Sequence, residues 1–346
     1  MNEQPRGTRP GRITIRDVAA DAGVSVAAVS KVLRNAYGVS PALRQNVLTS
    51  IEKLGYRPST AARGMRGRTF TIGVVLVEMG NPFLPDVIAG ISDACGADGY
   101  KVLIGLGQAQ LTLEESLLDS MMDHGMDGLI LVAPRMSGET LEAYARQTPL
   151  VVIAHHEPSP NAYDTVNSDD AAGAHMVVAE LVAAGHSDIA MISLLVADDN
   201  SQTHVSVARE KGYLTAMGDA GLEPSARILR MTGDKDLRQA QMQSFLSAPD
   251  RPTAVFCWSD LFAIELIGLA RSSGMNLPSD LSVIGYDNSP PATMPLIELT
   301  SVDQNARGLG GAAATALLSR IAGRTNPQRL MLKPTLAHRT SHGPAR

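Results

Sequence analysis

Apolar and polar positions in the first part of the chain follow the spacing of helices. Apolar residues recur every three or four positions and so share one helical face: Ile15, Val18, Ala19 and Ala22. Thr14 and Asp17 are spaced to cap the start of this helix, and Gly23 ends it. Ser25 can cap a second helix. The expected buried side of that helix holds Val29, Val32 and Leu33. Residues 14–33 therefore predict two short helices joined by a glycine turn, a helix-turn-helix.

A third helix is expected over residues 41–54. Ser40 and Pro41 have the order of a cap followed by proline at the first helical position, and Gly55 ends the helix. Its expected inward positions are Leu43, Val47, Ile51 and Leu54. A unit of three short helices is a known way to hold one helix in a DNA major groove. The pattern alone leaves open an amphipathic helix pair with no role in DNA binding.

From residue 70 onward, short apolar runs alternate with amphipathic stretches. The first set predicts strands at 71–77, 101–106, 128–133 and 150–155, with helices at 84–99 and 113–124. The second set predicts strands at 189–195, 226–231, 254–258 and 281–286, with helices at 171–184, 206–220, 237–247 and 261–273. This alternation is typical of parallel sheets covered by helices on both faces. Two such halves predict two lobes with a cleft, where ligands bind at the carboxyl ends of strands.

The charge is divided unevenly along the chain. Residues 1–68 hold twelve Lys and Arg against four Asp and Glu, a net charge of +8. Because the whole chain of 346 residues has a net charge of −5, the remaining residues carry −13. A basic head on an acidic body favours contact between the head alone and phosphate groups. Residues 1–11 are expected to be a disordered basic tail.

The composition narrows the class of protein. Hydrophobic residues make up 44% of the chain, yet no apolar run approaches the roughly 18 residues that a membrane span needs. The start of the chain is polar and lacks a hydrophobic signal region, so we expect a cytoplasmic protein that has no membrane partner. Cys95 and Cys257 supply neither a disulfide framework nor a zinc-site spacing, and we expect buried, reduced thiols.

Several long stretches carry a family resemblance. The runs ITIRDVAADAGVSVAAVSKVL, VSPALRQNVLTSIEKLGYRPSTAARGMR and TIGVVL resemble the start of the LacI/GalR family of bacterial transcription regulators. NPF at 81–83 and the segments at 166–192, 280–290 and 298–314 are similar to that family's effector domain. The resemblance implies an all-α helix-turn-helix DNA-binding head joined to an α/β, periplasmic-binding-protein-like effector domain of two doubly wound lobes.

The resemblance also implies where the domains of the chain begin and end. The head would be 12–57, a hinge helix or linker 58–69, and the effector-binding and dimerisation domain 70–346. Within that domain the N-lobe would be about 70–167 and 303–333, and the C-lobe about 168–302 and 334–346. The chain would cross between the lobes near Asn167, Val302 and Pro334.

Family positions imply which residues contact DNA. Val26, Ala27 and Lys31 match positions that read bases, and valine and alanine can touch only thymine methyl groups. Lys31 is therefore expected to make the main polar base contact. Met65 stands where a hinge helix would push an apolar wedge between base pairs, usually a leucine. The other expected DNA-binding residues are Thr14, Ser25, Ser30, Arg34 and Arg63.

Polar and aromatic residues that follow the predicted strands are the candidates for effector binding. Arg209 and Asp287 can hold the hydroxyl groups of a polar ligand, although they could equally be a solvated helix charge and a turn residue. Trp258 can stack on a ring or fill the core. Lys235 stands where the family often has an aromatic residue, and would suit an anionic group. The remaining candidates are Asn81, Phe83 and His155.

The sequence gives little support to an enzyme, a metal site or a cofactor. The paired acids lack a suitably spaced His or Ser, and the glycine-rich stretches at 105–107 and 308–311 are not a full dinucleotide fingerprint. Close helix packing is a sufficient reason for the second stretch. His155 and His156 have no third metal ligand at a matching spacing. We expect no catalytic residues, no bound metal and no cofactor.

These observations predict a transcriptional repressor that acts as a homodimer on a palindromic double-stranded operator. Its operator affinity would be controlled by a small-molecule effector, with a sugar or sugar derivative favoured. A purine or nucleoside effector or corepressor, activation of some promoters, and a solute-binding protein remain alternatives. The chain has no leucine heptad after residue 332, which favours a dimer over a tetramer.

Overall fold

The computed structural model describes residues 13–33, 36–56, 68–196 and 201–345. The chain divides into two compact units, Met1–Thr69 and Phe70–Arg346, and each is treated by itself. The expected basic tail, most of the expected hinge and the DNA-binding candidates Arg34, Arg63 and Met65 lie outside the described residues. In the described part, no helix is both long and apolar enough to cross a membrane.

The head consists of α1 (Ile15–Asp21), α2 (Val26–Leu33) and α3 (Pro41–Leu54). The predicted caps form. The backbone N–H of Thr14 donates to Asp17 Oδ2 at 2.7 Å, and Ser40 Oγ accepts from the N–H of Leu43 at 3.2 Å. Gly55 ends α3 in the left-handed conformation at φ 64°. The local hydrogen bonds therefore fix where each helix starts and stops.

The three helices share a small core of valines. Val18, Val29 and Val47 come from different helices and are completely buried. Leu33, which was expected to be buried, is 36% exposed. It is the last residue of α2, and the buried side of this helix ends at Val32. The prediction for Leu33 is therefore wrong, whereas the other inward positions in α1, α2 and α3 pack together.

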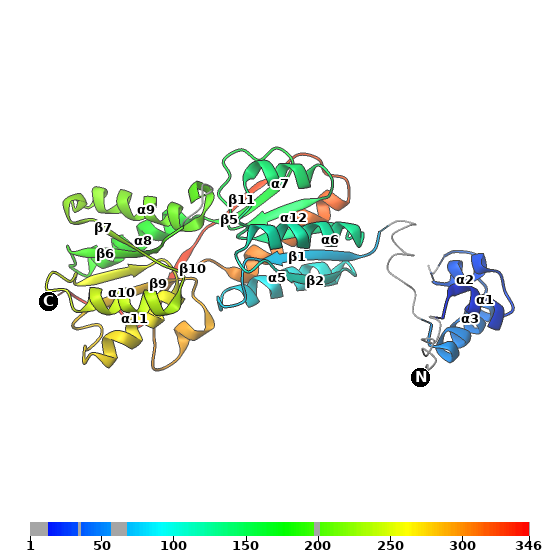
Figure 1. The fold of residues 1–346 in the computed structure, drawn as a ribbon, viewed down its shortest axis with the longest axis horizontal. Helices are drawn as coiled ribbons and strands as arrows, with labels where there is room; N and C mark the ends of the chain where they lie inside the picture. Colours follow the sequence, from blue (N-terminus) through cyan, green and yellow to red (C-terminus); the bar gives the residue numbers. More distant parts are fainter. Residues whose placement is uncertain (1–12, 34–35, 57–67, 197–200, 346) are drawn as a thin grey trace, which may run out of the picture. The chain divides into compact units, whose positions relative to one another are not determined.

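The second unit has two lobes, each built on a six-stranded sheet (Figure 1). The N-lobe sheet is entirely parallel and has the order β11-β5-β4-β3-β1-β2. Its strands are β1 (Thr71–Leu76), β2 (Lys101–Leu106), β3 (Gly128–Val132), β4 (Leu150–Ile153), β5 (Asp164–Ser168) and β11 (Arg329–Leu332). Its helices are α5 (Leu84–Ala97), α6 (Leu111–Asp123), α7 (Gly138–Ala145) and α12 (Ala306–Ile321).

The C-lobe sheet has the order β12-β10-β9-β8-β6-β7 and is parallel except for β12. Its strands are β6 (Ile189–Leu194), β7 (Arg227–Met231), β8 (Ala254–Cys257), β9 (Ser282–Tyr286), β10 (Thr300–Asp303) and β12 (Thr335–Ala337). Its helices are α8 (Asp170–Ala183), α9 (Val205–Asp219), α10 (Lys235–Leu246) and α11 (Asp260–Ser272). Three 3-10 turns lie at Ser201–Thr203, Glu223–Ser225 and Pro290–Thr293.

Helices cover both faces of each sheet, which explains the continuous apolar runs in the strands. In the N-lobe, Ile72 and Val74 pack toward α5 and α12, whereas Val75 packs toward α6 and α7. In the C-lobe, α8 and α9 lie on one face and α10 and α11 on the other (Figure 1). Cys95 in the N-lobe core and Cys257 in the C-lobe core are buried and free, as predicted, and burial raises the pKa of Cys95 to about 11.

The chain passes between the two sheets three times: from β5 to α8, from β10 to α12, and from β11 to β12. The resulting connections are joined to one another: the N–H of Asp169 donates to the Leu332 carbonyl at 2.9 Å, and Asp303 pairs with Thr335 (Figure 1). The alternation of residues 70–290 predicted both sheets. It did not predict α7 or the strands β5, β10, β11 and β12, whose sequences mix polar and apolar residues.

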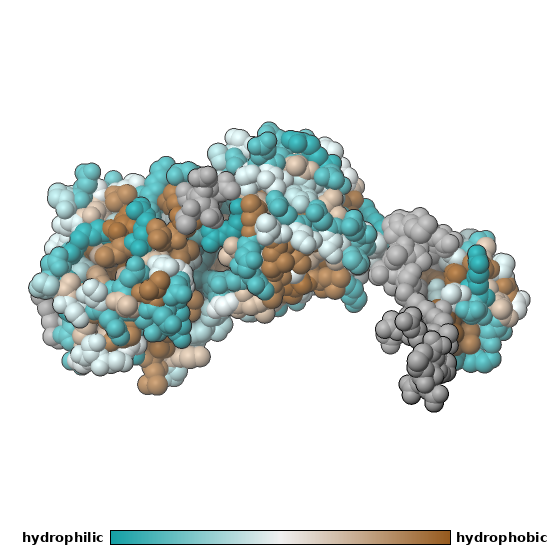
Figure 2. Space-filling view, viewed as in Figure 1, coloured by the Kyte–Doolittle hydropathy of each residue, from teal (hydrophilic) through white to brown (hydrophobic). Residues whose placement is uncertain are grey.

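One edge of the N-lobe sheet leaves apolar side chains exposed. β2 is the edge strand, and Leu103, Ile104 and Leu106 are 50%, 47% and 37% exposed. Figure 2 shows hydrophobic surface on this part of the lobe. An apolar edge strand of this kind is a common site of association between chains.

Candidate functional site

The exposed face of α2 is the first candidate surface. Val26 is 37% exposed, and Ala27 and Lys31 are also exposed. Contact with base edges requires such exposure. Thr14 and Ser25 are exposed at the starts of α1 and α2, where both side chains act in helix caps. Ser30 differs from these residues because it is only 7% exposed, on the core side of α2.

Two further side chains on the head were missed by the sequence analysis. Tyr37 is fully exposed between α2 and α3, and Arg16 is exposed in the first turn of α1. A lone aromatic residue in a polar segment was the signal that could have identified Tyr37. Both side chains are able to contact a sugar-phosphate backbone.

The second candidate site is a cleft of about 370 Å³ between the lobes of the α/β unit. Its walls come from the segments that follow β1, β2, β3 and β4 in the N-lobe and β6, β7, β8, β9 and β10 in the C-lobe. This is the edge where ligands of open parallel sheets bind. The lining includes five of the predicted effector-binding residues: Asn81, Phe83, Arg209, Trp258 and Asp287.

The backbone turns sharply at several of these strand ends. Ala109, Ala133, Ala154 and Asp287 all line the cleft and have positive φ values of 52°, 52°, 59° and 121°. Such conformations are unfavourable for residues other than glycine and cluster at ligand sites. The strain brings main-chain atoms and the carboxyl group of Asp287 to the surface of the cleft.

Arg209 is held by several partners and is not a solvated helix charge. Its Nε donates to Asp170 Oδ1 at 2.7 Å, one terminal nitrogen donates to the carbonyl of Trp258, and the guanidinium lies 3.7 Å from the ring centroid of Tyr286. The side chain is 3% exposed. Among the described residues, none accepts a hydrogen bond from the other terminal nitrogen, Nη2. This group is therefore oriented before a ligand enters.

Asp170 connects this arginine to the N-lobe. Its second oxygen lies 2.7 Å from Nε2 of His156. Burial alone would raise the pKa of Asp170, but the charges and hydrogen bonds of Arg209 and His156 outweigh burial and lower it. Asp170 therefore carries the negative charge that a buried guanidinium requires.

Asp287 faces both lobes. Its Oδ1 accepts from Gln304 Nε2 at 2.7 Å, and Asn81 Nδ2 of the N-lobe lies 3.5 Å from Oδ2. The nearest nitrogen of Arg209 is 4.0 Å away. Burial raises the pKa of Asp287 to about 8, even though the charge of Arg209 lowers it. A carboxyl group in this state can donate or accept a hydrogen bond near neutral pH.

Trp258 combines both of its predicted roles. Its ring lines the cleft and also packs edge-on against Phe262, with centroids 5.5 Å apart. The indole N–H is buried and has no hydrogen-bond partner among the described residues. Phe83 lines the same cleft from the N-lobe. The two aromatic rings therefore come from opposite walls.

Lys235 does not line the cleft and is exposed. Asp234 caps α10 at this point, so Lys235 is the first residue of the helix and Arg238 lies one turn later. Arg238 is 7% exposed and lines the cleft, and its Nε donates to Glu265 Oε2 at 2.7 Å. The cation in this wall is thus Arg238, which sequence reasoning missed. The helical spacing after the Asp234 cap was the available signal.

His155 lies behind the cleft. Its ring lines a small neighbouring hollow with Pro134, Arg135 and His204. The main chain of His155 makes two hydrogen bonds to the Asn167 side chain, at 2.9 and 3.0 Å. Burial, with a smaller contribution from His156, lowers the pKa of His155 to about 4, so its ring is neutral at physiological pH.

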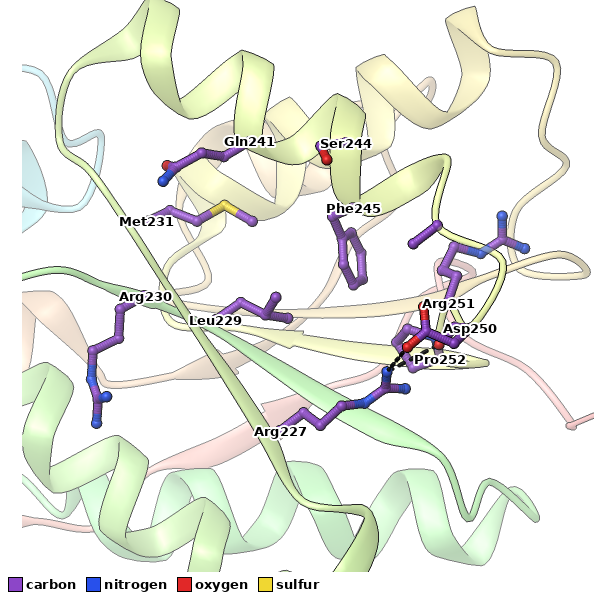
Figure 3. Close-up of a pocket in the computed structure, with 11 residues that line it drawn as sticks. Arg227, Leu229, Arg230, Met231, Gln241, Ser244, Phe245, Asp250, Arg251 and Pro252 are labelled. Carbon is purple, nitrogen blue, oxygen red and sulfur yellow. Dashed lines mark hydrogen bonds and ion pairs between the residues drawn. The ribbon is translucent and has the colours of Figure 1, made fainter.

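Another hollow, of about 430 Å³, lies on the C-lobe beside β7 and α10 (Figure 3). Leu229, Met231 and Phe245 point into it, and Arg227 at its rim pairs with Asp250 (Figure 3). Its walls belong to the C-lobe alone. A ligand there would not bridge the lobes, whereas a ligand in the cleft between the lobes contacts both.

Known proteins share both parts of this chain. Residues 14–59 match the family described as bacterial regulatory proteins, lacI family, and residues 178–342 match the periplasmic binding protein-like domain. The HTH-type transcriptional repressor PurR of Photobacterium profundum is 30% identical over 95% of this chain and 98% of its own length. The ribose operon repressor of Haemophilus influenzae is 31% identical over the same shares of the two chains.

A solved structure of a transcriptional regulator, CelR, in complex with cellobiose is also similar. It is 29% identical, covers 95% of this chain and all of its own, and has a TM-score of 0.69.

The chain belongs to the LacI family. The predicted fold class is confirmed, and so is the predicted function of a transcriptional repressor controlled by a small molecule. Since the family consists of regulators, the expectation that the chain is not an enzyme is confirmed as well.

Proposed function

We propose that this repressor binds a palindromic operator as a homodimer and releases it when a polar, polyhydroxylated effector closes the cleft between the lobes. The observation that carries this proposal is the polar cluster of Arg209, Asp287 and Asn81, which draws groups from both lobes into one cleft. A ligand that bonds to such a cluster changes the free energy of the closed arrangement relative to the open one.

The cleft suits a sugar or sugar derivative. Two buried guanidinium groups, a carboxyl group and two side-chain amides supply donors and acceptors for several hydroxyl groups. Trp258 adds a ring on which the apolar face of a sugar can stack. The relatives include a ribose operon repressor and a regulator solved with cellobiose, which supports this class of ligand.

A purine or nucleoside is the second candidate. Phe83 and Trp258 line opposite walls of the cleft, an arrangement that can hold a planar base between two rings. The similarity to PurR supports the same alternative. The two classes of effector would use different side chains. Binding of a purine base would depend on both aromatic rings, whereas binding of a sugar would depend chiefly on the polar cluster.

Exposed side chains support the DNA-binding and dimeric parts of the proposal. Val26, Ala27 and Lys31 present two apolar groups and one cation on α2, the helix that would enter the major groove. The apolar edge of β2 offers a surface for a second copy. Two heads related by a two-fold axis require an operator with two symmetric half-sites.

A thermal-shift screen of the full chain against sugars, sugar phosphates, nucleosides and purines tests the ligand class. We expect a sugar or sugar derivative to raise the melting temperature and to change the affinity for an operator selected from random DNA. Stabilisation by purines alone would favour the second candidate. A ligand that stabilises the chain but leaves operator affinity unchanged would contradict the proposed control.

A further inference from the structure

Three potential metal ligands from distant parts of the sequence meet on the C-lobe, away from the cleft. Glu180 lies on α8, His338 directly follows β12, and His342 comes four residues later. Glu180 Oε1 is 3.0 Å from His342 Nε2 and 3.4 Å from His338 Nδ1, and the three ligand atoms all lie within 4.8 Å of one another. We propose that this group, the Glu180 triad, binds a divalent transition-metal ion of the Zn²⁺ type.

The spacing of the triad matches a metal site. Ligands at the usual zinc distances and tetrahedral angles are about 3.3 Å apart. The two separations from Glu180, 3.0 and 3.4 Å, lie on either side of this value, and the ligand atoms of the two histidines lie within 4.8 Å of each other. An ion could therefore be bound with small side-chain adjustments and without movement of the main chain.

The main chain around the two histidines is fixed. His338 follows the antiparallel pair between Ala337 and Ser301. On one side of His342, Ser341 Oγ donates to the carbonyl of Val283 at 2.6 Å. On the other side, the N–H of Gly343 donates to Ser282 Oγ at 3.1 Å. Since both histidines are anchored to the sheet, little conformational entropy is lost when they bind an ion.

A second partner orients His342. Its Nδ1 lies 3.0 Å from Thr300 Oγ1, which leaves Nε2 directed at Glu180. Metal-binding histidines usually have such an outer partner for the other ring nitrogen. The guanidinium of Arg339, between the two histidines in sequence, turns away to the Leu299 carbonyl and the Asn288 side chain. Its charge is therefore directed away from an incoming cation.

The ligand set selects the class of ion. Two imidazoles and one carboxylate suit Zn²⁺, Co²⁺ or Ni²⁺, whereas Mg²⁺ and Ca²⁺ prefer sites made of oxygen atoms. The His338 side chain is 59% exposed, which gives an ion access and leaves room for water ligands. A bound ion would join α8 to the segment that follows β12, and would stabilise the C-lobe.

The test uses the full chain after treatment with a chelator and removal of the chelator. Zn²⁺ affinity is measured by competition with a chromophoric chelator, and Co²⁺ is added separately to record its visible absorption. The variants are His338→Gln and Glu180→Gln. The matched control is His175→Gln, because His175 forms an exposed pair with Asp219 at 3.1 Å without belonging to the triad.

We expect one Zn²⁺ per chain and a Co²⁺ spectrum of a site with nitrogen and oxygen ligands. Each triad variant should weaken Zn²⁺ binding by about tenfold or more and lose the spectrum, while the control retains both. Circular dichroism verifies that the variants fold, which the exposure of His338 favours. Equal Zn²⁺ affinity in the wild type and in folded His338→Gln would overturn the proposal, since the triad would then be an ion pair only.

Discussion

At the scale of single residues, Arg209 shows how the fold prepares the cleft. Its charge is balanced by Asp170 and its plane is fixed on Tyr286, so the group can bond to a ligand without first being ordered. This arrangement has a consequence for mutagenesis. Arg209→Ala would leave Asp170 as a buried charge and cost about 3–5 kcal/mol of stability. The effect of that substitution on the effector would be obscured by its effect on folding.

Asp287 predicts a dependence of stability on pH. Because its pKa is raised to about 8 in the folded chain, the folded state keeps a proton that the unfolded state loses near pH 4. The contribution of protonated Asp287 to the free energy of unfolding is therefore fully present below pH 4, and it is lost as the pH rises through about 8. Asp287→Asn cannot ionise, and asparagine has nearly the same size and shape as the aspartate that already adopts the φ of 121° at this position. Between pH 5 and 8 the wild type should lose up to about 1.4 kcal/mol per pH unit relative to the variant.

Urea unfolding at pH 5, 6.5 and 8 measures this difference. The exposed Asp236→Asn on α10 is the control and should follow the wild type. If the free energy of unfolding changed with pH by the same amount in Asp287→Asn and in the wild type, Asp287 would already be ionised at pH 5 in the folded chain.

Lys31 predicts a change in sequence preference. As an exposed cation on α2, it can bond to guanine, whereas its neighbours Val26 and Ala27 offer only apolar contacts. Lys31→Ala should relax the preference at one position in each half-site, with a loss of about 1–3 kcal/mol on the preferred sequence. Selection from random DNA followed by binding measurements on single-base variants tests this.

Lys53→Ala is the matched control, because Lys53 lies on α3 and pairs with Asp21. It also removes one positive charge from the head. Unchanged base preferences in Lys31→Ala, with uniformly weaker binding, would make Lys31 a phosphate contact instead.

At the scale of elements, α5 and α12 pack closely because of glycines. A Cβ at Gly310 would lie 2.0 Å from the Val87 carbonyl oxygen, and one at Gly90 would lie 2.1 Å from the Arg307 carbonyl oxygen. This contact gives the glycine-rich stretch at 308–311 a packing role, as the sequence analysis inferred. The neighbouring Gly311 is different, since its Cβ would meet its nearest atom at 3.9 Å.

The two adjacent glycines predict substitutions of opposite sign. Gly310→Ala should destabilise the chain by about 1–3 kcal/mol, because main-chain atoms of α5 must move. Gly311→Ala should stabilise it by about 0.5–1 kcal/mol, since alanine is the better helix former. Chemical unfolding of both variants measures the effects. Equal free energies of unfolding for the two variants would show that α5 and α12 can move apart to accommodate the extra methyl group without loss of stability.

The spacing of apolar residues predicted the strands whose sequences are apolar throughout. It did not predict buried strands whose sequences contain polar residues. β1 and β8 are apolar on both faces and are visible in the sequence, whereas β5 reads Asp-Thr-Val-Asn-Ser although it is fully buried. Contacts over long sequence separations also escaped prediction. The Arg209–Asp170 pair spans 39 residues, and Glu180 and His342 lie 162 residues apart. Arg238 was missed because one helical turn separates it from the expected position at Lys235.

At the scale of the whole molecule, the exposed edge of β2 predicts a dimer. Ile104 is 47% exposed on the edge strand, so a charge there would be solvated in a monomer but buried by a second copy packed on this edge. We expect Ile104→Asp to convert a stable dimer into monomers at micromolar concentration. Sedimentation velocity measures the change, with Leu214→Asp on α9, 47% exposed in the C-lobe, as the control. A stable tetramer of the wild type, or a dimer of Ile104→Asp, would contradict this account.

We propose that a ligand in the cleft between the lobes controls the affinity of the head for DNA. The direct test is operator binding by the full chain, titrated with the effector identified in the thermal-shift screen. Asp287→Gly removes the carboxyl group, and glycine adopts the φ of 121° without strain. The wild type is titrated first to establish whether the effector releases or strengthens the complex. Asp287→Gly should bind the free operator like the wild type and need at least about tenfold more effector for the same change. An unchanged effector requirement, or loss of operator binding in the folded variant, would contradict the account.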